Sequence, residues 1–202
     1  MGSFRVGAVL GAALLLITAC STKQQGTPTA AADTNTSVPP TGKTTGSAKP
    51  SVNRPKTIDL KTTDSCKIMN GMSAAEFGWQ GKKTIGKPSV AFASMTDCDV
   101  LVSGEFSAGV TAVTNVGVDD FTRNGQAPGV TPVTIGGFPG FTFLAPSGAP
   151  GICFAGMDVA DGQMLYVYWN SAKVAAERPA DSEICTNAVK VAEGALKVAV
   201  AS

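Results

Sequence analysis

The chain has 202 residues, a formal net charge of +1 and no histidine. The absence of histidine excludes the Ser-His-Asp and Cys-His catalytic arrangements and every metal site with a histidine ligand. No serine is followed by a lysine three residues later, which excludes the Ser-Lys arrangement of penicillin-recognising enzymes. Catalysis by carboxylates alone, or binding without catalysis, remains compatible with this composition.

The first nineteen residues have the pattern of an export signal. A short segment with one positive charge, Met1–Arg5, precedes fourteen uncharged residues, a run shorter than the ~20 apolar residues that cross a membrane. Ile17, Thr18 and Ala19 then lead into Cys20, which is the residue order of a bacterial lipobox. A cysteine is needed there because its thiolate can be alkylated by a diacylglycerol group. The alternative is a plain secretory peptide that is cleaved near Ala19.

The lipobox predicts where the mature protein lies. Residues 1–19 are expected to be removed as a lipoprotein signal peptide, and Cys20 to carry a diacylglycerol group and a further acyl chain. More than one chain is needed for stable anchoring, because a single chain binds membranes only marginally. We therefore expect a protein that is tethered to the outer face of the cell membrane.

Residues 20–57 are expected to form a disordered stalk. Residues 21–57 contain no aromatic side chain and are dominated by Thr, Pro, Gly, Ser and Ala. Such a segment buries too little apolar surface to offset the entropy that is lost on ordering. A flexible chain of this length has a root-mean-square span of roughly 30 Å. The stalk would therefore hold a globular domain, residues 58–202, away from the membrane.

The small net charge hides a difference between stalk and domain. Residues 21–57 contain five basic residues and one acidic residue, which gives +4. Residues 58–202 contain ten basic and fourteen acidic residues, which gives −4. Because domains that bind nucleic acid present a basic face, nucleic acid is not an expected partner.

Four further cysteines lie in the domain, and in an exported chain their even number indicates two disulfides. They are Cys66, Cys98, Cys153 and Cys185. Of the three possible pairings we favour Cys66 with Cys98 and Cys153 with Cys185, because neighbours along the chain pair without entangling it. The sequence has no Cys-x-x-Cys motif, so we expect neither a metal site nor another cofactor.

The first half of the domain shows helical and then alternating patterns. Asp64 or Ser65 can cap a short helix that continues through Met69, and residues 73–78 have the form of a second short helix that begins with a capping box. β-branched residues then alternate with polar ones, which predicts antiparallel strands. These strands are expected around residues 90–92, 98–102, 110–116, 133–135 and 141–144.

Residues 152–159 and 163–170 predict a hairpin that turns at Asp161-Gly162. Both faces of its second strand are apolar or aromatic, which fits a central strand that is covered on both sides. The alternative is that its tyrosine face lines a ligand groove beside the Gly/Pro turn at residues 136–140. The residues of this candidate groove are Phe138, Phe141, Met164, Tyr166 and Tyr168.

The chain ends in an amphipathic helix that begins near Asp181 or Ser182. Its apolar stripe consists of Ile184, Ala188, Val191, Ala192, Ala195 and Val198. Cys185 lies in the first turn and could join this helix to the strand that contains Cys153. The expected fold class is therefore α+β, an antiparallel sheet with N- and C-terminal helices packed on one face and two disulfides.

Several short motifs surround the domain cysteines: Asp64-Ser65-Cys66, Cys98-Asp99-Val100, Ile135-Gly136-Gly137, Ile152-Cys153 and Glu183-Ile184-Cys185. With the lipobox and the Thr/Pro-rich stalk, they resemble an actinobacterial family of cell-envelope lipoproteins whose four-cysteine domain has no known function. The resemblance covers about residues 58–200. It implies the two-disulfide α+β domain and the envelope location, and it supplies no catalytic residues. The usual proline before the first domain cysteine is Ser65 here.

The sequence contains no complete catalytic constellation. Asp97 with Asp99, or Asp119 with Asp120, could in principle act as a carboxylate pair of the glycosidase kind. Strand alternation places the first pair on the face opposite Cys98, and the second pair is typical of a solvated loop. We therefore expect a non-enzymatic envelope module that binds an envelope protein or a small apolar ligand. The alternative is an envelope hydrolase that uses carboxylates only.

Replacing Cys20 by serine tests the anchor. A serine hydroxyl is a far weaker nucleophile than a thiolate, so Cys20→Ser protein should leave the membrane fraction for the medium or remain an uncleaved precursor. Cell fractionation and intact-mass spectrometry measure both outcomes, and wild-type protein should show the added mass of the lipid. A correctly cleaved Cys20→Ser protein that stays bound to membranes would contradict lipidation at this residue.

Overall fold

The computed structural model describes residues 53–79, 84–102, 104–125, 127, 129–146, 149 and 151–202. The expected signal peptide, Cys20 and most of the expected stalk therefore lie outside the described residues.

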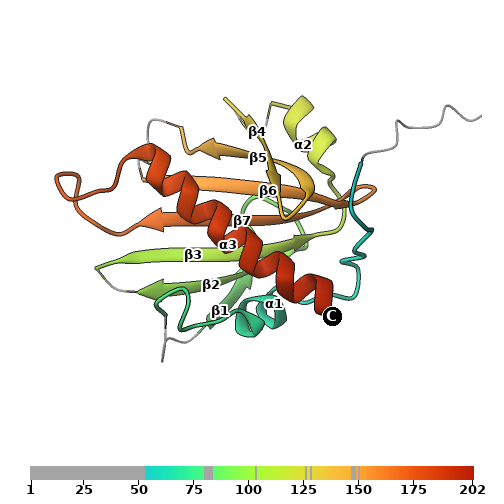
Figure 1. The fold of residues 1–202 in the computed structure, drawn as a ribbon, viewed down its shortest axis with the longest axis horizontal. Coiled ribbons are helices and arrows are strands. Elements are labelled where there is room, and N and C mark those ends of the chain that lie inside the picture. Colours follow the sequence, from blue (N-terminus) through green and yellow to red (C-terminus); the bar gives the residue numbers. More distant parts are fainter. Residues whose placement is uncertain are drawn as a thin grey trace, which may run out of the picture. The chain divides into compact units, whose positions relative to one another are not determined.

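Seven strands form one antiparallel sheet (Figure 1). Along the chain they are β1 (Thr84–Pro88), β2 (Thr96–Val102), β3 (Phe106–Val113), β4 (Thr131–Ile135), β5 (Phe138–Leu144), β6 (Ile152–Ala160) and β7 (Gln163–Ser171). Their order in the sheet is β1-β2-β3-β7-β6-β5-β4. Two meanders, β1 to β3 and β4 to β7, are thus joined by the pairing of β3 with β7, which sets Val110 opposite Val167.

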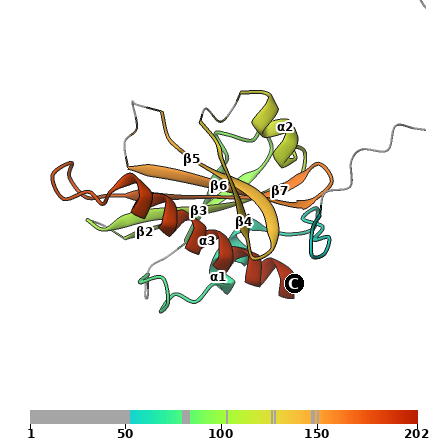
Figure 2. The same cartoon turned by 45° about the horizontal axis from the view of Figure 1, so that its top comes forward.

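The described residues also form three helices, α1 (Ser65–Gly71), α2 (Val118–Arg123) and α3 (Asp181–Ala201). Helix α3 contacts β3, β4, β5, β6 and β7, and α1 contacts β1, β2, β3 and α3. Figure 2 shows α2 on the side of the sheet away from α3. Within the described residues, no helix is both long enough and apolar enough to cross a membrane.

The larger hydrophobic cluster lies between the sheet and helices α1 and α3. Alternate residues of the central strands point into it, and Val110 and Val167 are fully buried there. The helices contribute Met69 of α1 and the small side chains Ala192 and Ala195 of α3, which allow close approach to the sheet. Burying a side chain the size of valine or methionine contributes roughly 1.5–3 kcal/mol, so this cluster supplies much of the driving force for folding.

A second, aromatic cluster covers part of the opposite face of the sheet, beneath α2. Phe121 of α2 stacks on Phe141 of β5 with ring centroids 5.4 Å apart, and it meets Tyr166 of β7 at 5.6 Å. Gly156 of β6 lies directly opposite Phe141, and a Cβ atom at this position would come within 2.5 Å of the ring. Strand β7 is therefore covered on both faces, as expected for a central strand.

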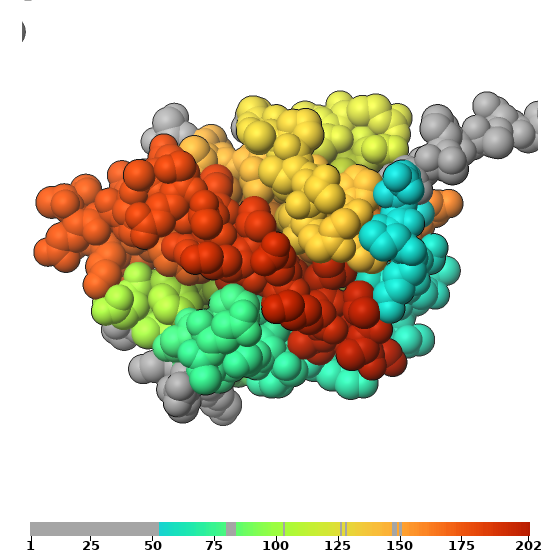
Figure 3. Space-filling model, viewed as in Figure 1, coloured from blue at the N-terminus to red at the C-terminus, as the bar shows by residue number. Residues whose placement is uncertain are grey.

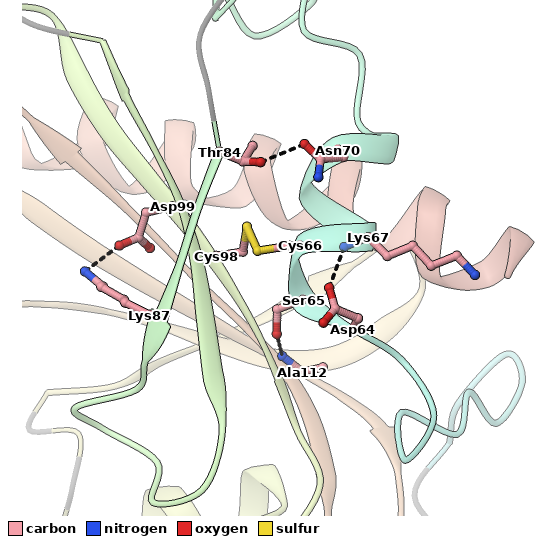
Figure 4. Close-up of a disulfide and its surroundings, with 10 residues drawn as sticks. All are labelled: Asp64, Ser65, Cys66, Lys67, Asn70, Thr84, Lys87, Cys98, Asp99 and Ala112. Carbon is pink, nitrogen blue, oxygen red and sulfur yellow. Dashed lines mark hydrogen bonds and ion pairs between the residues drawn. A yellow bond between two sulfur atoms is a disulfide. The ribbon is translucent and has the colours of Figure 1, made fainter.

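Both expected disulfides are confirmed. Cys66 pairs with Cys98 and joins α1 to β2, as Figure 4 shows. Cys153 pairs with Cys185 and joins β6 to the beginning of α3. Each helix that contacts the larger cluster is thus tied covalently to the sheet.

The start of α1 is fixed by two polar contacts (Figure 4). The Asp64 carboxylate accepts a hydrogen bond from the Lys67 backbone N–H at 2.9 Å, which caps the helix. The buried Ser65 hydroxyl oxygen accepts a hydrogen bond from the Ala112 N–H at 3.0 Å. Ala112 lies just beyond the last residue of β3 that β2 pairs with, so the serine satisfies a backbone donor that the ladder leaves open.

Four local elements differ from the sequence-based expectation. Residues 74–78 form turns instead of the helix expected over residues 73–78, and Gly78 ends the segment with a positive φ of 74°. Residues 90–92 form a bend in which Val90 is 97% exposed. The pattern also misses β1 and the short helix α2, where a loop was expected around Asp119 and Asp120. Phe121 explains α2, because this turn of helix carries its ring into the aromatic cluster.

The two disulfides should contribute equally to stability. Each closes an interval of 32 residues, and the loop-entropy estimate for this length is roughly 3–4 kcal/mol. We expect the double variants Cys66→Ala/Cys98→Ala and Cys153→Ala/Cys185→Ala to lower the free energy of unfolding by similar amounts in urea denaturation. Strongly unequal losses would contradict an effect that acts through the unfolded chain, and a crossed linkage in non-reducing peptide mapping would contradict the pairing.

Candidate functional site

An apolar groove lies at the C-terminal end of α3. Figure 3 shows three segments meeting there: the end of α3 (red), the β4–β5 turn (yellow) and the segment before Ile58 (cyan). The cavity has a volume of about 530 Å³. Its lining residues are Pro55, Lys56, Gly136, Phe138, Glu193, Leu196, Lys197 and Val200.

The turn between β4 and β5 shapes one wall of the groove. Gly136 and Gly137 have φ angles of 56° and 86°, which suit the tight hairpin turns that require positive φ at both central residues. A Cβ atom on Gly136 would come within 2.5 Å of Leu196, and one on Gly137 within 2.9 Å of Pro55. The two glycines therefore allow the turn to approach both α3 and the incoming chain.

The incoming chain is held in place by an arginine clamp. Arg54 Nε donates to Asp158 and Arg54 Nη2 donates to Asp161, both at 2.8 Å. Burial lowers the pKa of the Arg54 guanidinium, but the two carboxylates outweigh this effect, so the pKa is raised above its ordinary value. Lys56 Nζ donates to the Val200 carbonyl oxygen at 3.1 Å. The segment that carries Pro55 is thus fixed against the β6–β7 hairpin and the end of α3.

These contacts move the domain boundary. The sequence predicts that the domain begins at Ile58, whose N–H donates to Val159 at 2.8 Å. Arg54 and Lys56 already contact the domain and belong to its ordered part. The sequence pattern fails here because Arg54, Pro55 and Lys56 have the composition of the stalk, and only their partners distinguish them.

The floor of the groove is apolar and its rim is charged. Phe138 and Leu196 are buried at 2% and 5% exposure, whereas Val200 is 40% exposed and forms an open wall. The exposed side chains of Lys56, Glu193 and Lys197 complete the lining. An apolar floor with a few polar groups at its rim is typical of a pocket that binds a small molecule.

The structure does not bring the five residues of the candidate tyrosine groove to one surface. Phe138 lies in the larger cluster and at the floor of the groove beside α3. Phe141, Met164 and Tyr166 are buried in the aromatic cluster on the other face of the sheet. Tyr168 shares their face and is partly buried over Gly109. Strand alternation separates Phe138 from Phe141, because residues three apart on a strand face opposite ways.

Apart from Phe138, the residues that line the groove carried only weak signals in the sequence. Gly136-Gly137 indicated a turn, and Val200 continues the apolar pattern of α3 past the end of its buried stripe. Pro55 and Lys56 had no signal, because nothing local indicates that they fold back against Leu196 and Val200.

Three of the four carboxylates considered for catalysis already have a polar partner. Asp97 accepts a hydrogen bond from the Thr111 hydroxyl, and Asp99 forms an ion pair with Lys87, which Figure 4 shows. Asp120 pairs with Arg123 at 3.1 Å within α2. Neither aspartate pair lines the groove. Among the described residues, no group of three or more Cys, Asp or Glu side chains could hold a metal ion.

The comparisons place the chain in a family. Residues 15–197 match the domain described as "Protein of unknown function (DUF3558)", so the chain belongs to this family. Neither a curated protein nor a solved structure matches the chain. The expected four-cysteine family of unknown function is thus supported at the level of the domain.

Alkaline unfolding should be coupled to tyrosine ionisation. The chain has two tyrosines, and burial raises the pKa of both, with the nearby carboxylates of Asp97 and Asp99 adding to the shift. Their contribution to stability is therefore complete below the unfolded pKa of about 10 and is lost as the pH rises above it. We expect phenolate absorbance and far-UV circular dichroism to change together in an alkaline titration. Ionisation of either tyrosine near pH 10 in folded protein would contradict this burial.

Proposed function

We propose that this chain is a lipid-anchored lipoprotein on the outer face of the cell membrane, and that its domain binds a small apolar ligand without catalysing a reaction. The apolar groove beside α3 is the observation that carries the proposal. Support for the anchor comes from the lipobox at residues 17–20, which lies within the region that matches the family.

The chemistry of the groove favours an acyl chain as its occupant. A volume of about 530 Å³ falls in the range of small-molecule pockets. The Phe138 and Leu196 floor offers no hydrogen-bond partner, so a polar group placed there would lose its hydration without compensation. The charged side chains of Lys56, Glu193 and Lys197 lie at the rim, where the polar end of a ligand can stay in contact with them and with water. A membrane lipid that inserts one acyl chain fits this arrangement, and the anchor would keep the domain close to such lipids.

The packing of the N- and C-terminal helices on one face of the sheet supports the same site. With α1 and α3 on this face, the last turns of α3 pack into the larger cluster beside the β4–β5 turn. The groove forms where Val200, beside this buried stripe, is left exposed. The rival proposal of a carboxylate hydrolase has weaker support, because Asp97 and Asp99 are held by Thr111 and Lys87.

A charged substitution in the groove tests this proposal. Val200→Asp places a carboxylate in the groove wall and should weaken binding of a fluorescent fatty acid at least tenfold, about 1.4 kcal/mol. Full-length protein with Cys20→Ser avoids detergent, which would compete for the site. The binding titration is accompanied by mass spectrometry of lipids that copurify with the protein.

Val174→Asp is the matched control. Val174 is 65% exposed, compared with 40% for Val200, and it does not line the groove. The control should bind the fatty acid as the parent protein does. Equal binding by both aspartate variants, or no saturable binding by the parent protein, would contradict an apolar ligand in this groove.

A further inference from the structure

A second hollow, separate from the apolar groove, lies nearer the N-terminal end of α3. It has a volume of about 260 Å³ and is enclosed by residues 76–79, by the adjacent ends of β3 and β7, and by the middle of α3. We propose that this pocket binds one hexose-sized unit of a neutral sugar. The proposal rests on its own residues and does not depend on the ligand of the groove.

Two stacked aromatic pairs form the apolar side of this aromatic pocket. Phe77 stacks on Trp79 with ring centroids 4.9 Å apart, and Phe106 stacks on Trp169 at 5.9 Å. Trp79 is buried, and the other three rings are partly exposed. Four aromatic rings around so small a space give a ligand flat apolar surfaces to lie against.

The rings are held in position before any ligand binds. Backbone hydrogen bonds from Phe77 to Ser73 at 3.2 Å and from Trp79 to Ala74 at 3.0 Å fix the turn that carries the first pair. Gly194 of α3 lies against Phe77, and a Cβ atom there would come within 2.6 Å of the ring. A site whose walls are already ordered loses less entropy on binding.

The polar side of the pocket carries unused hydrogen-bonding groups. Asn187 and Lys190 lie three residues apart on α3 and therefore on one face of the helix. Within the described part of the chain, neither side chain takes part in a hydrogen bond or ion pair. Glu76 also lines the pocket, and its ion pair with Lys197 is long, at 4.0 Å. The amide of Asn187, the ammonium of Lys190 and the carboxylate of Glu76 thus offer hydrogen-bond donors and acceptors. The positive charge of Lys190 and the negative charge of Glu76 leave the pocket with no net charge.

This combination selects the class of ligand. A wholly apolar ligand would remove water from Asn187, Lys190 and Glu76 without replacing their hydrogen bonds. An anion would be opposed by Glu76, and a cation by Lys190. A pyranose ring presents C–H groups on its faces and hydroxyl groups around its edge, so it matches aromatic walls with a polar rim. The volume of the pocket suits a single ring.

The protein carries its own reporter of occupancy. The chain has two tryptophans, and both Trp79 and Trp169 line the aromatic pocket. A ligand that lies against these rings should change the intrinsic fluorescence directly. Purified full-length protein is titrated with methyl glucoside, methyl galactoside and methyl mannoside up to roughly 100 mM, because single sugars bind weakly. At least one of the three should give a saturable change.

Two variants and two controls decide the outcome. Asn187→Ala and Lys190→Met, both on the surface of α3, should each raise the Kd about tenfold through loss of a hydrogen bond. Thr186→Ala removes a polar side chain of the same helix and Lys61→Met removes a lysine charge, both outside the pocket, and each should leave the Kd within about twofold. No saturable change with any of the sugars would overturn the proposal. So would equal affinity in Asn187→Ala, Lys190→Met and the parent protein, and so would preferential binding of indole that these variants do not affect.

Discussion

The pairing of β3 with β7 is the contact on which the rest of the structure depends. It is the one ladder among the described strands that joins the two meanders, and both strands are buried along most of their length. Because α3 covers one face of β7 and α2 with its aromatic cluster covers the other, no part of the middle of this strand is free for a ligand. The two hollows therefore lie along α3, one beside the middle of the helix and one at its C-terminal end.

Covering the α2 face of the sheet with aromatic rings requires glycines at defined register positions. Gly109 is paired with Tyr168, and Gly156 is paired with Phe141. In both pairs a Cβ atom on the glycine would overlap the ring, so the aromatic side chain fills the space that the glycine leaves. A strand glycine normally weakens a sheet. Here the contacts of the cross-strand ring compensate for this loss of stability. Each large ring on one strand is thus matched to a glycine on the neighbouring strand.

Alternation and cysteine spacing were enough to predict the antiparallel sheet, the terminal helix and both disulfides, because these follow from local periodicity and short chain closure. Helix α2 was missed because its residues have weak periodicity. The helix is stabilised by the contacts of Phe121 with Phe141 and Tyr166, which are distant in the sequence. The candidate tyrosine groove failed for the same reason. Periodicity showed that Tyr166 and Phe141 have apolar neighbours, but it could not show that a distant helix covers them.

Ser65 illustrates a residue whose role depends on contacts that sequence patterns do not contain. It occupies the first position of α1, directly after the Asp64 cap, where a proline is well tolerated because its missing N–H has no partner in the helix. The family resemblance places a proline at this point. Serine keeps the helix start and adds the acceptor that the Ala112 N–H uses. The local requirement is therefore satisfied by either residue, while the contact to β3 is particular to serine.

The groove and the aromatic pocket lie on the same helix, and one ion pair connects them. Val191 of the pocket and Val200 of the groove are nine residues apart, a distance of roughly 14 Å along a helix. Glu76 lines the pocket, Lys197 lines the groove, and their charged groups are 4.0 Å apart. Both side chains are more than half exposed, so the pair is screened by water and transmits little free energy between the sites.

Because α3 is fixed to the sheet by its buried stripe and by the Cys153–Cys185 bond, a ligand at one site has no mobile element through which to alter the other site. The two sites should therefore be occupied independently, and the stiffness of the helix is what separates them.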